Sequence, residues 1–280
     1  MIIDAIKARQ SFRDIAALDE EALPLDRASL IMALEEYPDL DVQEYLRRLD
    51  TLAAQVEVLI GEEANPINTI EGINQVLFVQ EGLRGNDEDY YDPRNSYLNE
   101  VLDRRLGIPI SLSVIFMEVA KRIGFQIKGL GFPGHFLVKH VANDRDIIID
   151  PYNLGRILTP NDCQELLDKI DNGAVSMNAS LLKPMNKRAI LTRMLYNLKG
   201  VYIQKEQNHK ALSVIDRILM LNPWTPSEVR DRGLLYMETS LFAKALADLE
   251  AYLTRAVAPE DSAYIQNHIK MLRGIVCEPN

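Results

Sequence analysis

The sequence predicts an α+β core, preceded by a helical segment and followed by a repeating all-α domain. Three observations predict this order. Apolar residues recur at helical spacing in the first quarter of the chain, an entirely apolar helix precedes several β-type runs in the middle, and small residues recur at a fixed interval near the end. We place the three parts at residues 1–75, 76–182 and 183–280.

The first part, residues 1–75, is predicted to be helical. Sixteen acidic and six basic side chains give it a net charge of −10, equal to that of the whole chain. Such a surface disfavours nucleic acid and anionic lipid, because both need Lys and Arg to neutralise phosphate. The acidic side chains form a solvated helical face or, alternatively, contribute to a partner-binding surface. A single amphipathic stripe is formed by Val42, Tyr45, Leu46, Leu49, Leu52, Val56 and Leu59.

The composition is that of a globular protein, with 47% hydrophobic and 26% charged residues. Cys163 and Cys277 are far apart and lie in no Cys/His cluster, which argues against a disulfide framework and against structural zinc. No apolar run approaches the ~20 residues that span a bilayer, and the first residues lack the pattern of a signal peptide. We therefore expect a cytoplasmic protein that uses no membrane, metal or cofactor.

The middle part, residues 76–182, is predicted to pack one buried helix against an antiparallel sheet. Residues 109–123 are apolar on every side of a helix, with Pro109 suited to the first helical position and Gly124 to its end. Asn143-Asp144 and Pro133-Gly134 are predicted turns, and 159–162 resembles a capped helix start. The predicted strands are 126–130, 135–141 and 147–150.

The last part, residues 183–280, carries a repeat of about 34 residues. Gly200 and Gly233 are 33 positions apart, and Ala211 and Ala245 are 34 apart. Small residues where helices cross, with a proline closing each unit, indicate tetratricopeptide repeats, whose stacking makes a groove for a protein or peptide partner. A plain helical bundle is the alternative.

Three residues of the core have the order of a catalytic triad. Ser111 lies at a helix start, where free N–H groups can stabilise an oxyanion. His135 lies on a predicted strand and can act as a base, and Asp150 ends the next strand, where it can fix the tautomer of an imidazole.

These motifs resemble the transglutaminase-like superfamily, a papain-related fold with a Cys-His-Asp triad. The sequence His135-Phe136-Leu137 stands where the family has His-x-Trp, and Asp150-Pro151 matches its Asp motif. The arrangement is similar to the bacterial SirB-type branch, which joins such a core to C-terminal tetratricopeptide repeats. The resemblance covers about residues 70–275 and implies a papain/transglutaminase-like core.

The chain departs from the family at the nucleophile. The family's cysteine position falls at 107–109, where Pro109 stands, and Ser111 or Ser113 are the candidates within two residues. Cys163 follows the Asp motif and Cys277 lies at the end of the chain, so neither is placed to substitute. A core without its thiol predicts a non-catalytic interaction protein. The alternative is a hydrolase or acyl-transferase that uses Ser111, His135 and Asp150.

Each candidate also has a structural interpretation. His135 can be a hydrogen-bonded core histidine, Asp150 can cap a turn, and Ser111 can satisfy a free N–H of its own helix. Asn95 can donate to an oxyanion or organise a loop, and Tyr90-Tyr91 can line a cleft or only pack. The separating test is geometric: a Ser111 nucleophile needs its Oγ within roughly 3 Å of a His135 ring nitrogen.

Overall fold

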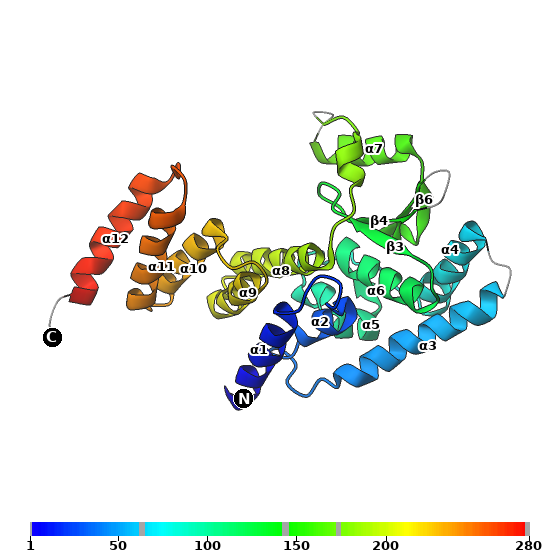
Figure 1. Ribbon diagram of the computed structural model, residues 1–280, viewed down its shortest axis with the longest axis horizontal. Helices are drawn as coiled ribbons and strands as arrows, with labels where there is room; N and C mark the ends of the chain where they lie inside the picture. Colours follow the sequence, from blue (N-terminus) through cyan, green and yellow to red (C-terminus); the bar gives the residue numbers. More distant parts are fainter. Residues whose placement is uncertain (1, 62–64, 142–145, 172–174, 278–280) are drawn as a thin grey trace. The chain divides into compact units, whose positions relative to one another are not determined.

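The computed structural model describes residues 2–61, 65–141, 146–171 and 175–277, and it confirms the predicted α+β class (Figure 1). The chain forms two compact units, residues 1–194 and 195–280. The first unit contains both the N-terminal helices and the sheet. The second unit contains only helices.

The N-terminal helices are α1 (Ile2–Ala16), α2 (Leu25–Ile31), α3 (Val42–Ile60) and α4 (Pro66–Asn74), which continues into a π-helical turn, Gln75–Gln80. The predicted amphipathic helix is α3. Asp41 caps it by accepting hydrogen bonds from the N–H groups of Gln43 and Glu44. Both α2 and α3 contact the central helix α6 (Pro109–Arg122), so the acidic N-terminal part packs on the core.

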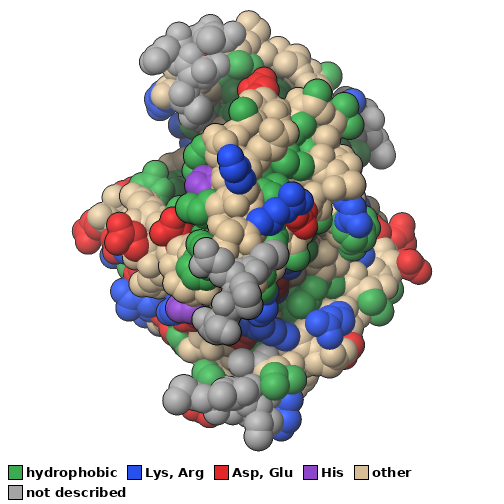
Figure 2. All heavy atoms as spheres, turned by 90° about the vertical axis from the view of Figure 1, so that its left-hand side faces the viewer, with side chains coloured by type: hydrophobic (Ala, Val, Ile, Leu, Met, Phe, Trp, Pro, Cys, Tyr) green, Lys and Arg blue, Asp and Glu red, His purple; other side chains and the backbone are tan. Residues whose placement is uncertain are grey.

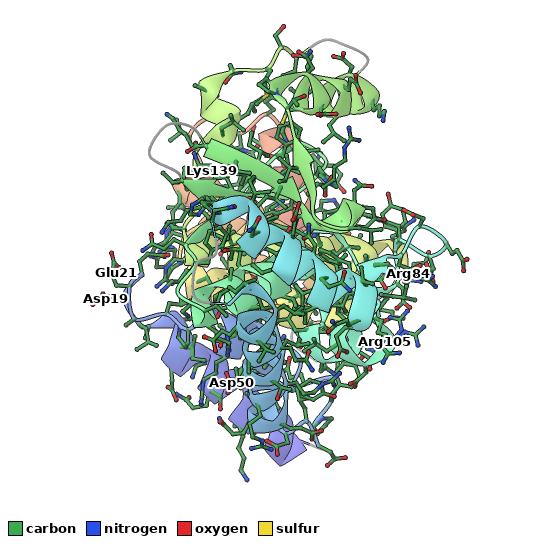
Figure 3. All side chains as sticks on the ribbon, turned by 90° about the vertical axis from the view of Figure 1, so that its right-hand side faces the viewer. Asp19, Glu21, Asp50, Arg84, Arg105 and Lys139 are labelled. Atoms are coloured by element: carbon green, nitrogen blue, oxygen red, sulfur yellow. The ribbon has the colours of Figure 1, made fainter. Side chains whose placement is uncertain are left out.

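The central helix begins at Pro109, as predicted, and ends at Arg122, two residues before Gly124. Two short parallel strands, β1 (Arg84–Gly85) and β2 (Leu106–Gly107), precede it and were not predicted. Arg84 and Arg105 lie close together at this edge (Figure 3), where the N–H of Arg84 donates to the carbonyl of Arg105. Between the strands lie a 3-10 turn, Pro93–Ser96, and α5 (Leu98–Arg104).

The sheet is antiparallel, in the order β3 (Ile127–Leu130), β4 (Leu137–Val141), β5 (Asp146–Asp150) and β6 (Arg156–Leu158). His135 was predicted to lie on a strand, and this is wrong: it lies two residues before β4. The turn at Pro133-Gly134 extends to His135, whose N–H donates to the carbonyl of Phe132 at 3.2 Å. Strand β6 was not predicted, and the predicted turn at Asn143-Asp144 lies outside the described residues.

Helix α7 (Pro160–Asp171) lies on one side of the sheet and α6 on the other (Figure 1). Thr159 and Asp162 cap α7 reciprocally, as predicted: the N–H of Thr159 donates to Asp162, and the N–H of Asp162 donates to Thr159 Oγ1. Cys163 and Leu167 of α7 are buried against one face of the sheet, in a cluster with Leu130, Phe132, Leu137, Ile148 and Leu158.

The second unit comprises residues 195–204 of α8 (Lys187–Gln204), α9 (Asn208–Leu221), α10 (Pro226–Glu238), α11 (Phe242–Arg255) and α12 (Ser262–Cys277). A Cβ added to Gly233 would lie 2.7 Å from Leu249 Cδ2, so the predicted close crossing of α10 and α11 is confirmed. The same prediction is wrong for Gly200, where an added Cβ meets no atom within 4 Å. Among the described residues, no helix has the length and apolarity to cross a membrane.

Acidic and basic side chains are scattered over the face of the molecule shown in Figure 2, with hydrophobic side chains between them. Neither sign gathers into one broad patch on that face. The net charge of −10 is therefore not displayed there as a single acidic surface.

Candidate functional site

The imidazole of His135 and the carboxylate of Asp150 form a hydrogen-bonded pair. Nε2 of His135 lies 2.9 Å from Oδ1 of Asp150. The His135 side chain is 11% exposed and the Asp150 side chain 1% exposed, so the pair lies at the margin of the core. The structure thus brings together two of the three residues of the predicted triad.

Asp150 is held by its own chain as well as by the imidazole. It ends β5 and caps the following 3-10 turn, Pro151–Asn153, by accepting from the N–H groups of Tyr152 at 3.1 Å and Asn153 at 3.3 Å. The side-chain amide of Asn153 also donates to Asp150 Oδ2 at 2.6 Å. Asp150 therefore both caps a turn and orients the imidazole, so the two interpretations of this residue are compatible.

The pairing determines which nitrogen of His135 is available for chemistry. A carboxylate only accepts hydrogen bonds, so Nε2 of a neutral imidazole donates and Nδ1 carries the free lone pair. Nδ1 makes no hydrogen bond to any residue that the structure describes. Proton transfer by His135 would therefore use Nδ1.

Ser111 is not joined to this pair. Its side chain is fully buried in the first turn of α6, where Oγ accepts from the N–H of Ile108 at 3.0 Å. The hydroxyl donates to the carbonyl of Asn95 at 2.6 Å, and the carbonyl of Ile108 lies 3.1 Å away. Within the described residues no hydrogen bond links Ser111 to His135. This geometry favours the capping interpretation.

The other candidate nucleophiles are placed no better. Ser113 Oγ donates to the carbonyl of Phe136 over 3.4 Å. Cys163 is buried, and burial raises the pKa of its thiol, helped by the charges of Asp162 and Asp150. A raised pKa keeps the thiol protonated, the opposite of what a nucleophilic cysteine needs. The side chain of Cys277 lies outside the described residues.

Tyr152 packs beside the imidazole of His135. Its ring meets that of His135 edge-to-face, with centroids 5.8 Å apart, and its hydroxyl donates to Asp87 at 2.6 Å. Burial and the Asp87 carboxylate both raise the pKa of this phenol, so it stays protonated. A Cβ on Gly85 would come within 2.5 Å of the Tyr152 ring, so only glycine allows this approach. The sequence signal for Tyr152 was its place directly after Asp150-Pro151.

Arg193 supports the turn that carries His135. Its guanidinium donates to the carbonyls of Phe132 and His135 and lies over the ring of Phe136. Tyr90 is close enough to act electrostatically on Arg193, whose pKa is lowered by burial. No sequence pattern indicated Arg193, because it is 58 positions away from His135.

Asn95 organises a loop. Its amide donates to the carbonyls of Asp89 at 2.7 Å and Tyr90 at 3.3 Å, and its oxygen accepts from Asn86 at 3.0 Å. Both amide hydrogens are therefore committed, which favours the loop interpretation over an oxyanion donor. In the part of the chain that the structure describes, no three His, Cys, Asp or Glu side chains are grouped to hold a metal ion.

Comparison with known proteins is consistent with this architecture. The model of the transglutaminase-like superfamily matches residues 43–196, and a tetratricopeptide repeat model matches residues 198–269. A UPF0162 protein of Xylella fastidiosa (strain Temecula1) is 39% identical over 271 residues, covering 92% of this chain and 93% of that protein. A UPF0162 protein of Pseudomonas aeruginosa is 30% identical over 90% of this chain and 92% of its own length.

A mouse protein, F-box only protein 21, is similar over a shorter stretch. It is 31% identical over 196 residues, which is 67% of this chain and 29% of the mouse protein. No solved structure matches the chain.

Proposed function

Because the chain belongs to the UPF0162 family of proteins with a transglutaminase-like core and C-terminal tetratricopeptide repeats, we propose that it is a non-catalytic protein that binds a protein or peptide partner through its repeats. The core keeps the imidazole–carboxylate pair of His135 and Asp150 as part of its scaffold.

The proposal that the protein is non-catalytic rests on the hydrogen bonds of the Ser111 hydroxyl. A serine nucleophile must give its proton to a base in the site, and the hydroxyl proton of Ser111 is directed instead to backbone carbonyls. The position where the family has cysteine is occupied by Pro109, which starts α6. The pair formed by His135 and Asp150 therefore has no nucleophile to activate among the described residues.

The partner-binding part is supported by the side chains on residues 195–204 of α8. Tyr196 and Ile203 are 39% and 42% exposed, and they lie seven residues apart on one side of the helix. Between them Lys199 is tied to α10, with Nζ 2.7 Å from Glu228 Oε2 and 2.7 Å from Asp231 Oδ2. An apolar stripe on a helix held rigidly by a buried ion pair can receive a peptide. We assign the partner contact to Tyr196 and Ile203.

Site-specific photo-crosslinking in cells tests the partner-binding part. A benzophenone amino acid replaces Ile203 in the full chain, and the matched control carries it at Val257, which is 96% exposed on a loop. We expect one discrete adduct from position 203, lost when Tyr196→Ala is added, and no such adduct from position 257. The same adduct from both positions, or none from either, would contradict this assignment.

The alternative, a Ser-His-Asp hydrolase or acyl-transferase, retains one observation in its favour: Nδ1 of His135 is free to accept a proton. A fluorophosphonate probe separates the two. We expect no labelling of the full chain beyond that of Ser111→Ala. Labelling that disappears in both Ser111→Ala and His135→Ala would establish the enzyme.

A further inference from the structure

Strand β3 forms one edge of the four-stranded sheet, because the strand order is β3-β4-β5-β6. Only part of this edge is covered by the chain itself. The N–H of Met185 donates to the carbonyl of Gly129 at 2.9 Å, and Pro184 bridges to Leu130. After Met185 the chain turns into α8, which Asn186 caps through the N–H of Ala189. The edge beyond Gly129 therefore stays open.

The uncovered part of the edge is the backbone of Ile127, a residue that is 8% exposed. In an antiparallel ladder, successive residues direct their N–H and C=O groups to alternate sides. The carbonyl of Gly129 is directed outward to Met185, so the N–H and C=O of Ile127 are directed outward too. The carbonyl of Gln126 has the opposite direction, since it accepts from His140 of β4 at 2.9 Å. Ile127 faces His140 in the β3–β4 ladder, but no described residue makes a hydrogen bond to its outward N–H or C=O.

A cavity of about 710 Å³ lies against this open edge. It belongs wholly to the first unit and does not involve His135 or the repeats. Its apolar lining includes Leu25, Met117, Ile127, Met185 and Ile190.

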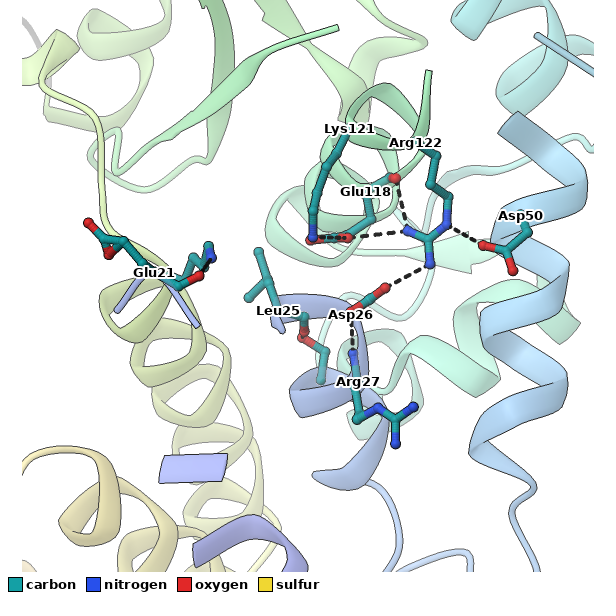
Figure 4. Close-up of polar contacts among 10 residues, drawn as sticks. Glu21, Leu25, Asp26, Arg27, Asp50, Glu118, Lys121 and Arg122 are labelled. Atoms are coloured by element: carbon teal, nitrogen blue, oxygen red, sulfur yellow. Dashed lines mark hydrogen bonds and ion pairs between the residues drawn. The ribbon is translucent and has the colours of Figure 1, made fainter. Parts of the chain in front are cut away.

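The cavity is also lined by Glu118 of α6, a carboxylate that is only partly satisfied. Its side chain is 4% exposed. Figure 4 shows how Oε2 is held by Lys121 at 3.3 Å and by Arg122 at 3.2 Å. Oε1 makes no hydrogen bond to a described residue. Burial raises the pKa of Glu118, and the nearby Asp26 raises it further.

The charges around Glu118 leave one negative charge in excess. Arg122 is shared among Glu118, Asp26 and Asp50, with 2.7 Å to each of the two aspartates (Figure 4). Three carboxylates therefore face two cations, Arg122 and Lys121. The other charged residues that line the cavity are Glu20, Glu21, Lys128 and Lys187, two of each sign, so they do not change this excess.

We infer that this cavity binds an extended peptide segment of a partner protein, which adds a strand to β3 at Ile127 and places a basic side chain on Glu118. The outward N–H and C=O of Ile127 require a main-chain partner, which a peptide strand supplies. The apolar lining receives a neighbouring side chain of the peptide. A Lys or Arg of the peptide donates to Oε1 of Glu118 and neutralises the excess charge. This site is independent of the proposed repeat groove.

The test is a selection of random octapeptides, displayed on phage, against the full chain. Ile127→Pro removes the outward N–H, since proline is tolerated at an edge position whose N–H faces away from the ladder. It also replaces the buried Ile127 side chain that lines the cavity, so N-methylated peptides are tested alongside it. Ile127→Val keeps that N–H and is the matched control. We expect a class of peptides with a central Lys or Arg that binds the parent chain and Ile127→Val but not Ile127→Pro.

The charge contact is tested separately with Glu118→Gln, which keeps the shape of the side chain. We expect the affinity of the selected peptides to fall about tenfold, as for the loss of one charged hydrogen bond. Replacing the peptide's basic residue by norleucine should cost the parent chain the same factor and Glu118→Gln nothing. If Ile127→Pro fails to fold, N-methylation of the peptide amides tests the other half of the ladder, because it removes the peptide N–H that would donate to the carbonyl of Ile127.

Two outcomes would overturn the inference. One is a selection that yields no peptide sensitive to Ile127→Pro or to N-methylation. The other is a sensitive class whose central residue is acidic or uncharged. Peptides that bind Ile127→Pro and the parent chain with equal affinity use another surface. Their binding to Tyr196→Ala then tests the proposed repeat groove independently.

Discussion

Removal of the Ser111 hydroxyl should destabilise the first unit without affecting a catalytic step. In Ser111→Ala the N–H of Ile108 and the carbonyl of Asn95 lose the hydrogen bonds of 3.0 and 2.6 Å that they make with Oγ. Ile108 is 3% exposed and Asn95 0%, so water does not replace the lost partner. Each buried polar group left unpaired costs about 1–3 kcal/mol. We therefore expect the free energy of unfolding to fall by about 2–4 kcal/mol.

The measurement must separate the two units, because they need not unfold together. The single tryptophan, Trp224, lies in the second unit. Urea unfolding followed by tyrosine near-ultraviolet circular dichroism reports the first unit as well, whereas tryptophan fluorescence reports the second unit alone. Ser111→Ala should shift the first signal and leave the fluorescence transition in place.

The control is Ser113→Ala, which loses one long hydrogen bond of 3.4 Å and should cost less than about 1 kcal/mol. Equal stability losses for the two variants would refute the capping role of Ser111. So would a Ser111→Ala protein that is as stable as the parent but has lost a hydrolytic activity.

Three further predictions concern buried charges and one close helix crossing. Lys199→Met leaves Glu228, which is 2% exposed, without its ammonium partner. It should lower the free energy of unfolding of the second unit by about 3–5 kcal/mol, measured by tryptophan fluorescence. Adding Glu228→Gln should restore much of the lost stability. Gly233→Ala should lower the same stability by about 1–3 kcal/mol, since its Cβ would overlap the next helix, whereas Gly200→Ala should raise it by up to about 1 kcal/mol. Burial would raise the pKa of Asp26, but hydrogen bonds from the Arg122 guanidinium and from the backbone N–H of Arg27 outweigh burial and lower the pKa. The contribution of Asp26 to stability should therefore be present above pH ~4 and be lost as pH falls through that lowered pKa. Urea unfolding between pH 6 and 3 should show this loss for the parent chain and not for Asp26→Asn.

The elements that the sequence predicted well have their signals within a few residues. The central helix carries Pro109 at its start and Gly124 after its end, and Thr159 with Asp162 encodes the start of α7. Strand β6 was missed because Arg156–Leu158 is too short to show an alternating pattern. His135 was assigned to a strand because the turn before it extends through a hydrogen bond that no local pattern records.

The sequence motifs of the candidate site could be predicted, but the contacts between its side chains could not. The order of His135 and Asp150 indicated a pair, and the structure places them 2.9 Å apart. Arg193 could not be found, because it reaches the His135 turn from 58 residues away. The open edge at Ile127 was equally hidden, since an edge is defined by which strands pair and by where the chain leaves them.

By itself the sequence determined the order of helices and strands, the absence of a cysteine at the start of the central helix, and the spacing of the repeat. Those properties depend on periodicity, capping and residue identity, which act over one or two turns of chain. Only the tertiary structure decided that the Ser111 hydroxyl bonds to the carbonyl of Asn95, that Cys163 of α7 is buried against the sheet, and that Glu118 lines a cavity. Hydrogen bonding and burial are properties of neighbours in space, and those neighbours come from distant parts of the chain.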